Sequence, residues 1–466
     1  MALLTVPAIW GLDLVFREKN RGNHEQAALL SVSPLNLALL ILMIMVLVSI
    51  QASGDLKLSL EKINGVVLGV GLYYAVVRES RRESDFIRTL FLFLGGGIAW
   101  SVLGFLGMDY IIRLPFLAPV ISRIPRVLPA LPGLEAGLQH NAVGGTILWF
   151  FPVLIAVSVL LLMENTRNIQ QNLSKGLKFK VDGSLPDQTR TRVMKWMLRT
   201  VDNPAFNWIF RVAIWAGTLF VGGVLVLSQS RGSLIAIACT GFGLLVWLRS
   251  GKIRRMLLIL FSTAIVFLAV WLFTSASGRA WIPQADPAVQ SGFSFDSIAF
   301  RLQVWPRAVQ GIEEFPLTGM GMNTFREKVL VLYPFPFPLP EIDIAHAHNE
   351  FLQAALDLGI PGLIAFLSMY LISYWMLWRT WESADNAAAI SGGAYTGGSL
   401  FMTPALIRHL VLGLGGGLFA HMVFGMADAI TLGAKPGIFF WYLLGLITGL
   451  YKLTIESSKL KIQNEE

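Results

Sequence analysis

The chain has 466 residues, of which 55% are hydrophobic and 14% are charged, and its net charge is +8. A soluble domain carries about 25% charged residues, so this low charge together with long apolar blocks excludes a soluble protein. The apolar blocks show no period of two, which disfavours a membrane barrel. The single cysteine, Cys239, excludes a disulfide, zinc or iron–sulfur framework within one chain. The composition therefore predicts an all-α polytopic membrane protein.

Apolar runs of about 18 residues can cross the hydrocarbon layer as helices. Residues 2–16 form a weaker apolar stretch, interrupted by Pro7 and Asp13, and are expected to be interfacial. Ten spans are then predicted in chain order: residues 35–50, 63–77, 87–106, 143–163, 208–227, 233–248, 256–273, 361–377, 410–426 and 437–451. Several of these runs are short, so we expect about ten to twelve transmembrane helices extended by their flanking residues.

The distribution of basic residues predicts the orientation of these spans. With both termini in the cytoplasm, 24 Lys and Arg residues fall on the cytoplasmic side and 12 on the outer side. The predicted organisation follows: residues 1–34 as a cytoplasmic or interfacial N-terminus, 35–273 as seven helices, 274–360 as an outer loop, 361–451 as three helices, and 452–466 as a cytoplasmic tail. Long loops are uncommon unless they are functional, so the outer loop is the expected catalytic segment.

A short turn between two apolar runs carries the first candidate residue, Arg231, within Ser230-Arg231-Gly232. A guanidinium offers a planar fork of donors to phosphate oxygens, and the small neighbours allow a ligand to approach the backbone. The turn therefore fits a site for a lipid-linked diphosphate. It also fits a simple connector whose arginine binds lipid headgroups.

The outer loop contributes Arg301, Arg307 and a glycine-rich turn. A short surface helix is predicted from three apolar residues at helical spacing, Ile298, Leu302 and Trp305. Both arginines would lie on a different side of this helix. After this helix, Gly319 and Gly321 permit a tight turn. The turn has no lysine in the place that a phosphate loop requires, so a nucleotide site is disfavoured.

Two histidines precede the eighth span, in His346-Ala347-His348-Asn349. The residues that follow predict a short helix that ends at Gly359. Histidine titrates near neutral pH and suits general base catalysis, so His348 is the candidate base. A metal site and a structural histidine are the alternatives. Side chains two apart on a helix diverge, and the sequence suggests no third ligand, which disfavours the metal.

Taken together and in this order, these motifs resemble the O-antigen ligase superfamily, which includes lipopolysaccharide O-antigen ligases, polysaccharide polymerases and protein O-oligosaccharyltransferases. The matching segments are Ser-Arg-Gly at 230–232, Arg-x-x-x-Trp at 301–305 before the glycine turn, and His-Asn-x-aromatic-Leu at 348–352 before Gly-Ile-Pro-Gly at 359–362. The pair at 140–141 and the turn at 428–437 also resemble the family. The resemblance covers roughly residues 139–450.

This resemblance implies a GT-C-type glycosyltransferase in the bacterial inner membrane that works without cofactor, metal or nucleotide sugar. It would move a glycan from undecaprenyl diphosphate to a hydroxyl of a polysaccharide, lipid or protein acceptor, and it would not bind nucleic acid. Arg231 and Arg301 would bind the diphosphate, and His348 would deprotonate the acceptor. The remaining substrate-binding residues would be Asn349, Arg307, Gly319 and Gly321. Nothing in the sequence distinguishes the three kinds of acceptor.

A transporter or flippase for lipid-linked glycan is the alternative function. Transporters carry charged residues within spans that line a cavity, and often discontinuous helices in paired repeats. The predicted spans here are almost free of charge, and the polar candidates gather on one side. This pattern favours chemistry at the membrane surface.

Overall fold

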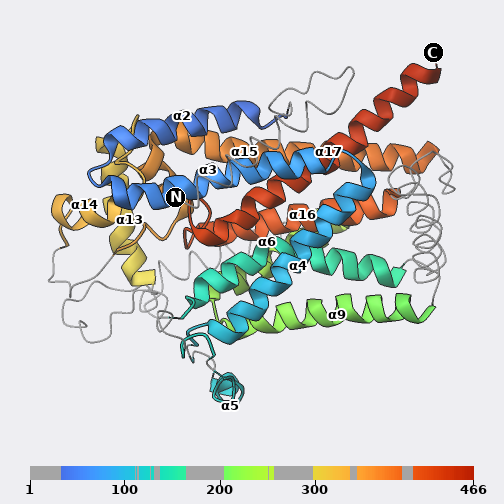
Figure 1. Cartoon of the computed structure of the whole chain (residues 1–466), viewed down its shortest axis with the longest axis horizontal. Coiled ribbons are helices and arrows are strands. Elements are labelled where there is room, and N and C mark those ends of the chain that lie inside the picture. The colour runs from blue at the N-terminus through green and yellow to red at the C-terminus, as the bar shows by residue number, and fades with distance from the viewer. Residues whose placement is uncertain are drawn as a thin grey trace, which may run out of the picture.

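The computed structural model describes residues 33–110, 112, 115–125, 127–130, 137–163, 204–249, 251–256, 298–335, 344–390 and 402–465. Within these residues the regular elements are all helices, which confirms the predicted all-α class (Figure 1). The long helices are α2 (Asn36–Ala52), α3 (Leu56–Glu79), α4 (Glu83–Gly107), α6 (His140–Met163), α9 (Pro204–Leu227), α10 (Arg231–Trp247), α13 (Ile298–Glu314), α15 (Glu350–Ile390), α16 (Pro404–Gly425) and α17 (Ile438–Glu465). The shorter ones are η1 (Pro115–Leu117), α5 (Ala118–Ile121), α14 (Phe325–Leu332) and η3 (Lys435–Gly437).

Seven helices in the described part of the chain are long and apolar enough to cross a membrane. They are Leu56–Glu79, Glu83–Gly107, His140–Met163, Trp208–Leu227, Glu350–Asn386, Pro404–Gly425 and Lys435–Ile455. The helices α2 and α10 are apolar but shorter, with 17 residues each. Each of nine predicted spans falls on one of these helices. The tenth, 256–273, lies almost wholly outside the described residues, as do residues 2–16.

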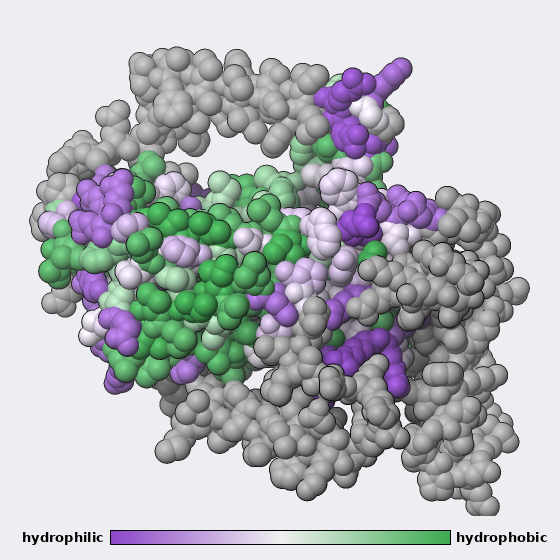
Figure 2. All heavy atoms as spheres, turned by 90° about the horizontal axis from the view of Figure 1, so that it is seen from above, coloured by the Kyte–Doolittle hydropathy of each residue, from purple (hydrophilic) through white to green (hydrophobic). Residues whose placement is uncertain are grey.

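The outer surface of the bundle is rich in apolar side chains. Leu37 and Leu47 of α2 are 68% and 62% exposed, and Leu371 of α15 is 70% exposed. Figure 2 shows a broad hydrophobic surface over the bundle with hydrophilic residues gathered toward its borders. A soluble monomer rarely exposes contiguous apolar surface on this scale, whereas a bundle in lipid requires it. The chain is therefore a multi-pass membrane protein.

The helix α6 lies at the centre of the bundle and is buried along most of its length. It packs closely on α16 because two glycines of α16 face its backbone. A Cβ atom on Gly417 would lie 2.4 Å from the Trp149 carbonyl oxygen, and one on Gly413 would lie 2.9 Å from the Val153 Cα. Small residues at such interfaces let membrane helices approach to backbone contact.

A second, smaller hydrophobic cluster forms at one end of the bundle, where α13 and α14 pack on the first turns of α15 (Figure 1). The face of α13 that enters this cluster is not the predicted one. Phe300, Val304 and Ala308 are buried, whereas Leu302 is 41% exposed. The predicted surface helix is therefore present as α13, but Leu302 does not belong to its buried face, because apolar residues occur on more than one side of this helix.

The first turns of α15 form a separate short helix, as predicted. Gly359 interrupts the helix with φ 68° and ψ 179°, and the membrane-spanning part continues from Pro361. This backbone conformation is open to glycine and strained for other residues. The kink holds the short helix 350–358 and the loop before it over the end of the bundle.

Candidate active site

The two histidines lie in a bent loop that leads into α15. Asn349 begins the helix as its N-cap, since its side-chain oxygen accepts hydrogen bonds from the backbone N–H groups of Phe351 and Leu352, both at 3.0 Å. His348 has a positive φ of 49°, and its N–H donates to His346 Nδ1 at 3.1 Å. The ring centroids of the two histidines are 4.3 Å apart. The prediction that these side chains diverge was wrong, because it assumed a helical backbone.

Asp428 faces both histidines from the turn after α16. Its Oδ1 atom lies 3.6 Å from His346 Nε2 and 3.7 Å from His348 Nδ1. These separations are ion-pair distances, slightly longer than hydrogen bonds. Asp428 is 2% exposed. Sequence reasoning placed the 428–437 turn in the resemblance but did not identify Asp428 as a site residue, because about 80 residues separate it from the histidines.

His346 and Asp428 hold different charges at neutral pH. Burial, with the positive charges of Lys62 and Arg301 and the neighbouring His348, lowers the pKa of His346 to about 3 against the attraction of Asp428. Burial alone would raise the pKa of Asp428, but the two histidines hold it below its usual value. His346 is therefore neutral, with its proton on Nε2 because Nδ1 accepts the His348 N–H. The carboxylate of Asp428 is ionised.

Two predicted site residues, Arg301 and Asn349, donate hydrogen bonds to carbonyl oxygens of the turn that carries Asp428. Arg301 on α13 donates from Nε to the Ala427 oxygen at 2.8 Å. Asn349 donates from its side-chain nitrogen to the Met426 oxygen at 3.1 Å. These two bonds bring the guanidinium of Arg301 and the histidine loop to the same turn, residues 426–428.

The turn that carries Arg231 also lies close to residues 426–428. Ser230 caps α10, with its hydroxyl accepting from the Ser233 N–H at 3.4 Å, and Arg231 itself is exposed. A Cβ atom on Gly232 would lie 3.4 Å from the Phe424 ring and 3.9 Å from the Ala427 Cβ. The three motifs predicted from sequence therefore meet at one turn, residues 426–428, although they come from separate helices.

The side chain of Arg307, another predicted substrate-binding residue, makes its contacts with other parts of the protein. Arg307 donates to the carbonyl oxygens of Gln303, Tyr333 and Pro334 at 2.6 to 3.0 Å and lies 3.8 Å from the ring centroid of Phe335. Its guanidinium therefore ties α13 to the segment after α14.

The glycine turn is also packed against protein. Gly319 has φ 68°, and an added Cβ would lie 2.6 Å from the Gly359 nitrogen. Gly321 has φ 100°, and an added Cβ would lie 3.0 Å from backbone atoms of Ser53. Both residues are buried, so close packing of α15 and the end of α2 explains these glycines without a ligand.

His346, His348 and Asp428 offer ligand atoms within 4.8 Å of one another, which is compact enough for a metal ion. Asp428 supplies the third ligand that the sequence did not suggest, so the argument against a metal from missing ligands no longer holds. Arg301 and Lys62 both lie close enough to His346 to lower its pKa. Their positive charges oppose a divalent cation at this place.

A buried acid and base lie directly behind the site. His421 Nδ1 of α16 lies 3.5 Å from Glu350 Oε2, and both side chains are almost fully buried. His421 stacks on Trp149 with centroids 4.0 Å apart. A Cβ on Gly425 would lie 2.5 Å from the Glu350 carboxylate, so glycine there makes room for it. Sequence reasoning missed this pair, because Glu350 and His421 belong to different helices, α15 and α16, and only packing brings them together.

Residues 216–367 match the family described as O-antigen ligase. The matched segment contains Arg231, Arg301 and both histidines of the loop, and it ends before Asp428. Among curated protein sequences, none matches the chain. This match supports the O-antigen ligase and polymerase superfamily, and the described part of the matched segment contains the turn of Arg231, the helix of Arg301 and the histidine loop.

Proposed function

We propose that the protein transfers a glycan from an undecaprenyl diphosphate carrier to an acceptor hydroxyl. The observation that carries this proposal is that Arg301, the histidine loop and the turn containing Arg231 meet at residues 426–428, where cations for a diphosphate lie near a base for an alcohol. The match to the O-antigen ligase family supports the same class of reaction.

His348 takes the proton of the acceptor hydroxyl in this proposal. Asp428 lies near His348 Nδ1, and an ionised carboxylate there favours the tautomer with a proton on Nδ1. His348 Nε2 then carries the lone pair that accepts the proton. The carboxylate also stabilises the imidazolium that forms, as the acid does in a Ser-His-Asp triad.

The arginines act on the leaving group. The acceptor oxygen forms a bond to the anomeric carbon while the bond from that carbon to the diphosphate oxygen breaks. The electron pair leaves with undecaprenyl diphosphate, so negative charge grows on the diphosphate. Arg301, held by its bond to the Ala427 oxygen, and the exposed Arg231 nearby stabilise that charge. The mechanism requires no metal ion.

We place the site at the outer face of the bacterial inner membrane, with both termini in the cytoplasm. The twofold excess of basic residues on the opposite side of the predicted spans supports this orientation. Arg231, Arg301 and His348 all lie on the side with fewer basic residues. The acceptor is a hydroxyl of lipopolysaccharide core, a growing polysaccharide or a protein.

Proteoliposomes that contain the purified protein and a lipid-linked glycan test this function. We expect the donor to disappear as free undecaprenyl diphosphate appears in equal amount, with one new glycosidic linkage for each carrier released. A flippase would leave the lipid-linked donor intact, and that result would refute the proposal. The same assay in right-side-out membrane vesicles, with an oligosaccharide acceptor that cannot cross the membrane, tests the side on which the site opens.

A further inference from the structure

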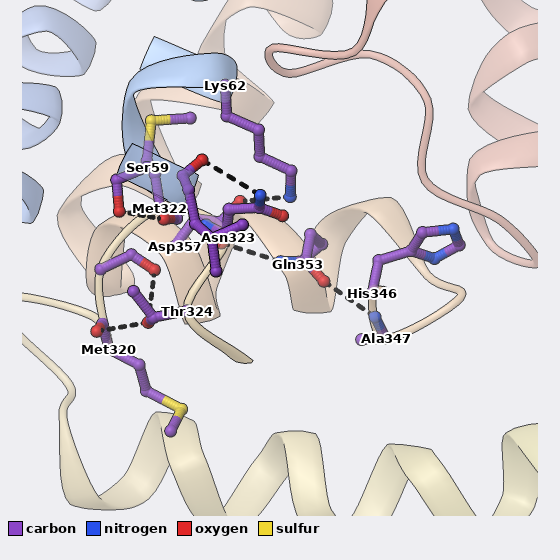
Figure 3. A network of polar contacts seen from close by, with 12 residues as sticks. Ser59, Lys62, Met320, Met322, Asn323, Thr324, His346, Ala347, Gln353 and Asp357 are labelled. Atoms are coloured by element: carbon purple, nitrogen blue, oxygen red, sulfur yellow. Dashed lines mark hydrogen bonds and ion pairs between the residues drawn. The ribbon is translucent and has the colours of Figure 1, made fainter. Parts of the chain in front are cut away.

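A buried polar network joins α3 to the histidine loop (Figure 3). Asp357 of α15 is fully buried, and its Oδ2 atom lies 3.1 Å from Lys62 Nζ of α3. Its Oδ1 atom accepts from the Asn323 N–H at 3.1 Å and from Gln353 Nε2 at 2.8 Å. The carboxylate thus has a partner in α3, in the turn after Gly321, and in its own helix.

The Asp357 carboxylate fixes which way the Gln353 amide points. A carboxylate only accepts hydrogen bonds, so Gln353 must turn its NH₂ group toward Asp357. Its oxygen, Oε1, is then left to accept from the Ala347 N–H at 2.8 Å. Ala347 stands between the two histidines and is fully buried. The network therefore anchors the peptide at Ala347, next to His346 (Figure 3), and His348 follows directly in the chain.

The histidine loop needs such an anchor because its backbone is strained. A positive φ is uncommon for residues other than glycine, and His348 has φ 49°. Such conformations persist when surrounding contacts over-determine them. The Ala347 N–H bond to Gln353 and the His348 N–H bond to His346 are the contacts that hold this loop with its rings toward Asp428.

The same stretch of α3 also contacts the segment that carries Asp428. A Cβ on Gly65 would lie 2.3 Å from the Gly433 oxygen, and one on Gly433 would lie 2.4 Å from the Lys62 oxygen. Helix α3 therefore touches the turn after Asp428 with its backbone and reaches Asp357 with the Lys62 side chain. One membrane helix contacts both halves of the site.

We propose that Lys62, Asp357 and Gln353 form a positioning network that sets the peptide at Ala347 and thereby holds His348 against Asp428 for proton transfer. These three residues touch no reacting atom and act through the histidine loop. The inference rests on the proposed function, since it assigns to these residues the geometry of the base that the function requires.

Gln353→Glu tests the network through its dependence on pH. At neutral pH the introduced carboxylate keeps an acceptor for Ala347 but loses the donor to Asp357 and repels it. Its surroundings are Asp357, Lys62 and His346. We expect glycan transfer to fall roughly 10- to 100-fold, the cost of a displacement of about 1 Å. Protonation in acid restores a donor toward Asp357, so activity relative to wild type should rise about tenfold from about pH 8 to about pH 5.5.

Two further variants complete the test. Gln353→Leu lacks both donor and acceptor, so its rate of glycan transfer should be low at every pH. Gln310→Glu, at an exposed position of α13, should transfer glycan at the wild-type rate throughout. All proteins are compared as equal amounts of monodisperse sample. Wild-type activity in Gln353→Glu, or equally low activity at every pH, would overturn the network. Absence of transfer by the wild-type protein would instead overturn the proposed function.

Discussion

His348→Ala should lower glycan transfer roughly 10²- to 10⁴-fold, the usual cost of losing a general base. Membrane insertion and binding of the lipid-linked donor should be retained, because His348 is not part of the bundle core and the arginines remain. The rate of carrier release in proteoliposomes measures the effect, and donor binding is measured separately on the same preparation.

His346→Ala is the matched control two residues away. Its ring is neutral and accepts the His348 N–H, so its loss should loosen the loop and reduce transfer less than His348→Ala does. Activity should also survive EDTA. Equal tolerance of both substitutions would show that His348 is structural, and loss of activity in EDTA that zinc restores would show that the two histidines and Asp428 hold a metal.

Arg301→Ala and Arg231→Ala should each reduce transfer about 10²- to 10³-fold, the typical cost of removing one fixed donor to a developing anion. Lysine at either position should keep part of the activity, because it supplies the charge without the planar fork. Arg301→Lys should be the more damaging lysine variant, since it also loses the bond from Nε to the Ala427 oxygen.

Arg255→Ala, at an exposed position beyond the far end of α10, is the control for a general loss of positive charge. It should leave transfer unchanged. Near wild-type transfer by correctly inserted Arg231→Ala and Arg301→Ala proteins would exclude the diphosphate-binding role.

Local patterns in the sequence predicted most of the helical framework. Apolar runs have one physical solution in lipid, a helix, so nine predicted spans coincide with helices such as α6 and α16. The interruption at Gly359 was also predicted, because glycine and the following Pro361 end a helix locally. The candidate residues Arg231, Arg301 and His348 were found because each lies in a short contiguous motif whose residue types indicate its chemistry.

The partners of those residues could not be predicted, because they depend on packing between distant segments. Asp428 meets the histidines only because α16 returns its end to the start of α15. The convergence of His346 and His348 depends on a backbone angle at His348 that no periodicity reveals. Asp357 and Gln353 look like ordinary helical polar residues until Lys62 and Ala347 are brought beside them.

The most direct measurement of the central claim is photo-cross-linking of the wild-type protein to an undecaprenyl-diphosphate-linked glycan that carries its reactive group beside the diphosphate. Mass spectrometry of the digested adduct should place the label on peptides that contain residues 230–232, 301–305 and 426–428, and unlabelled donor should compete. Adducts confined to the opposite ends of α10 and α15, from a protein that still transfers glycan, would contradict the claim that these three segments form the donor site.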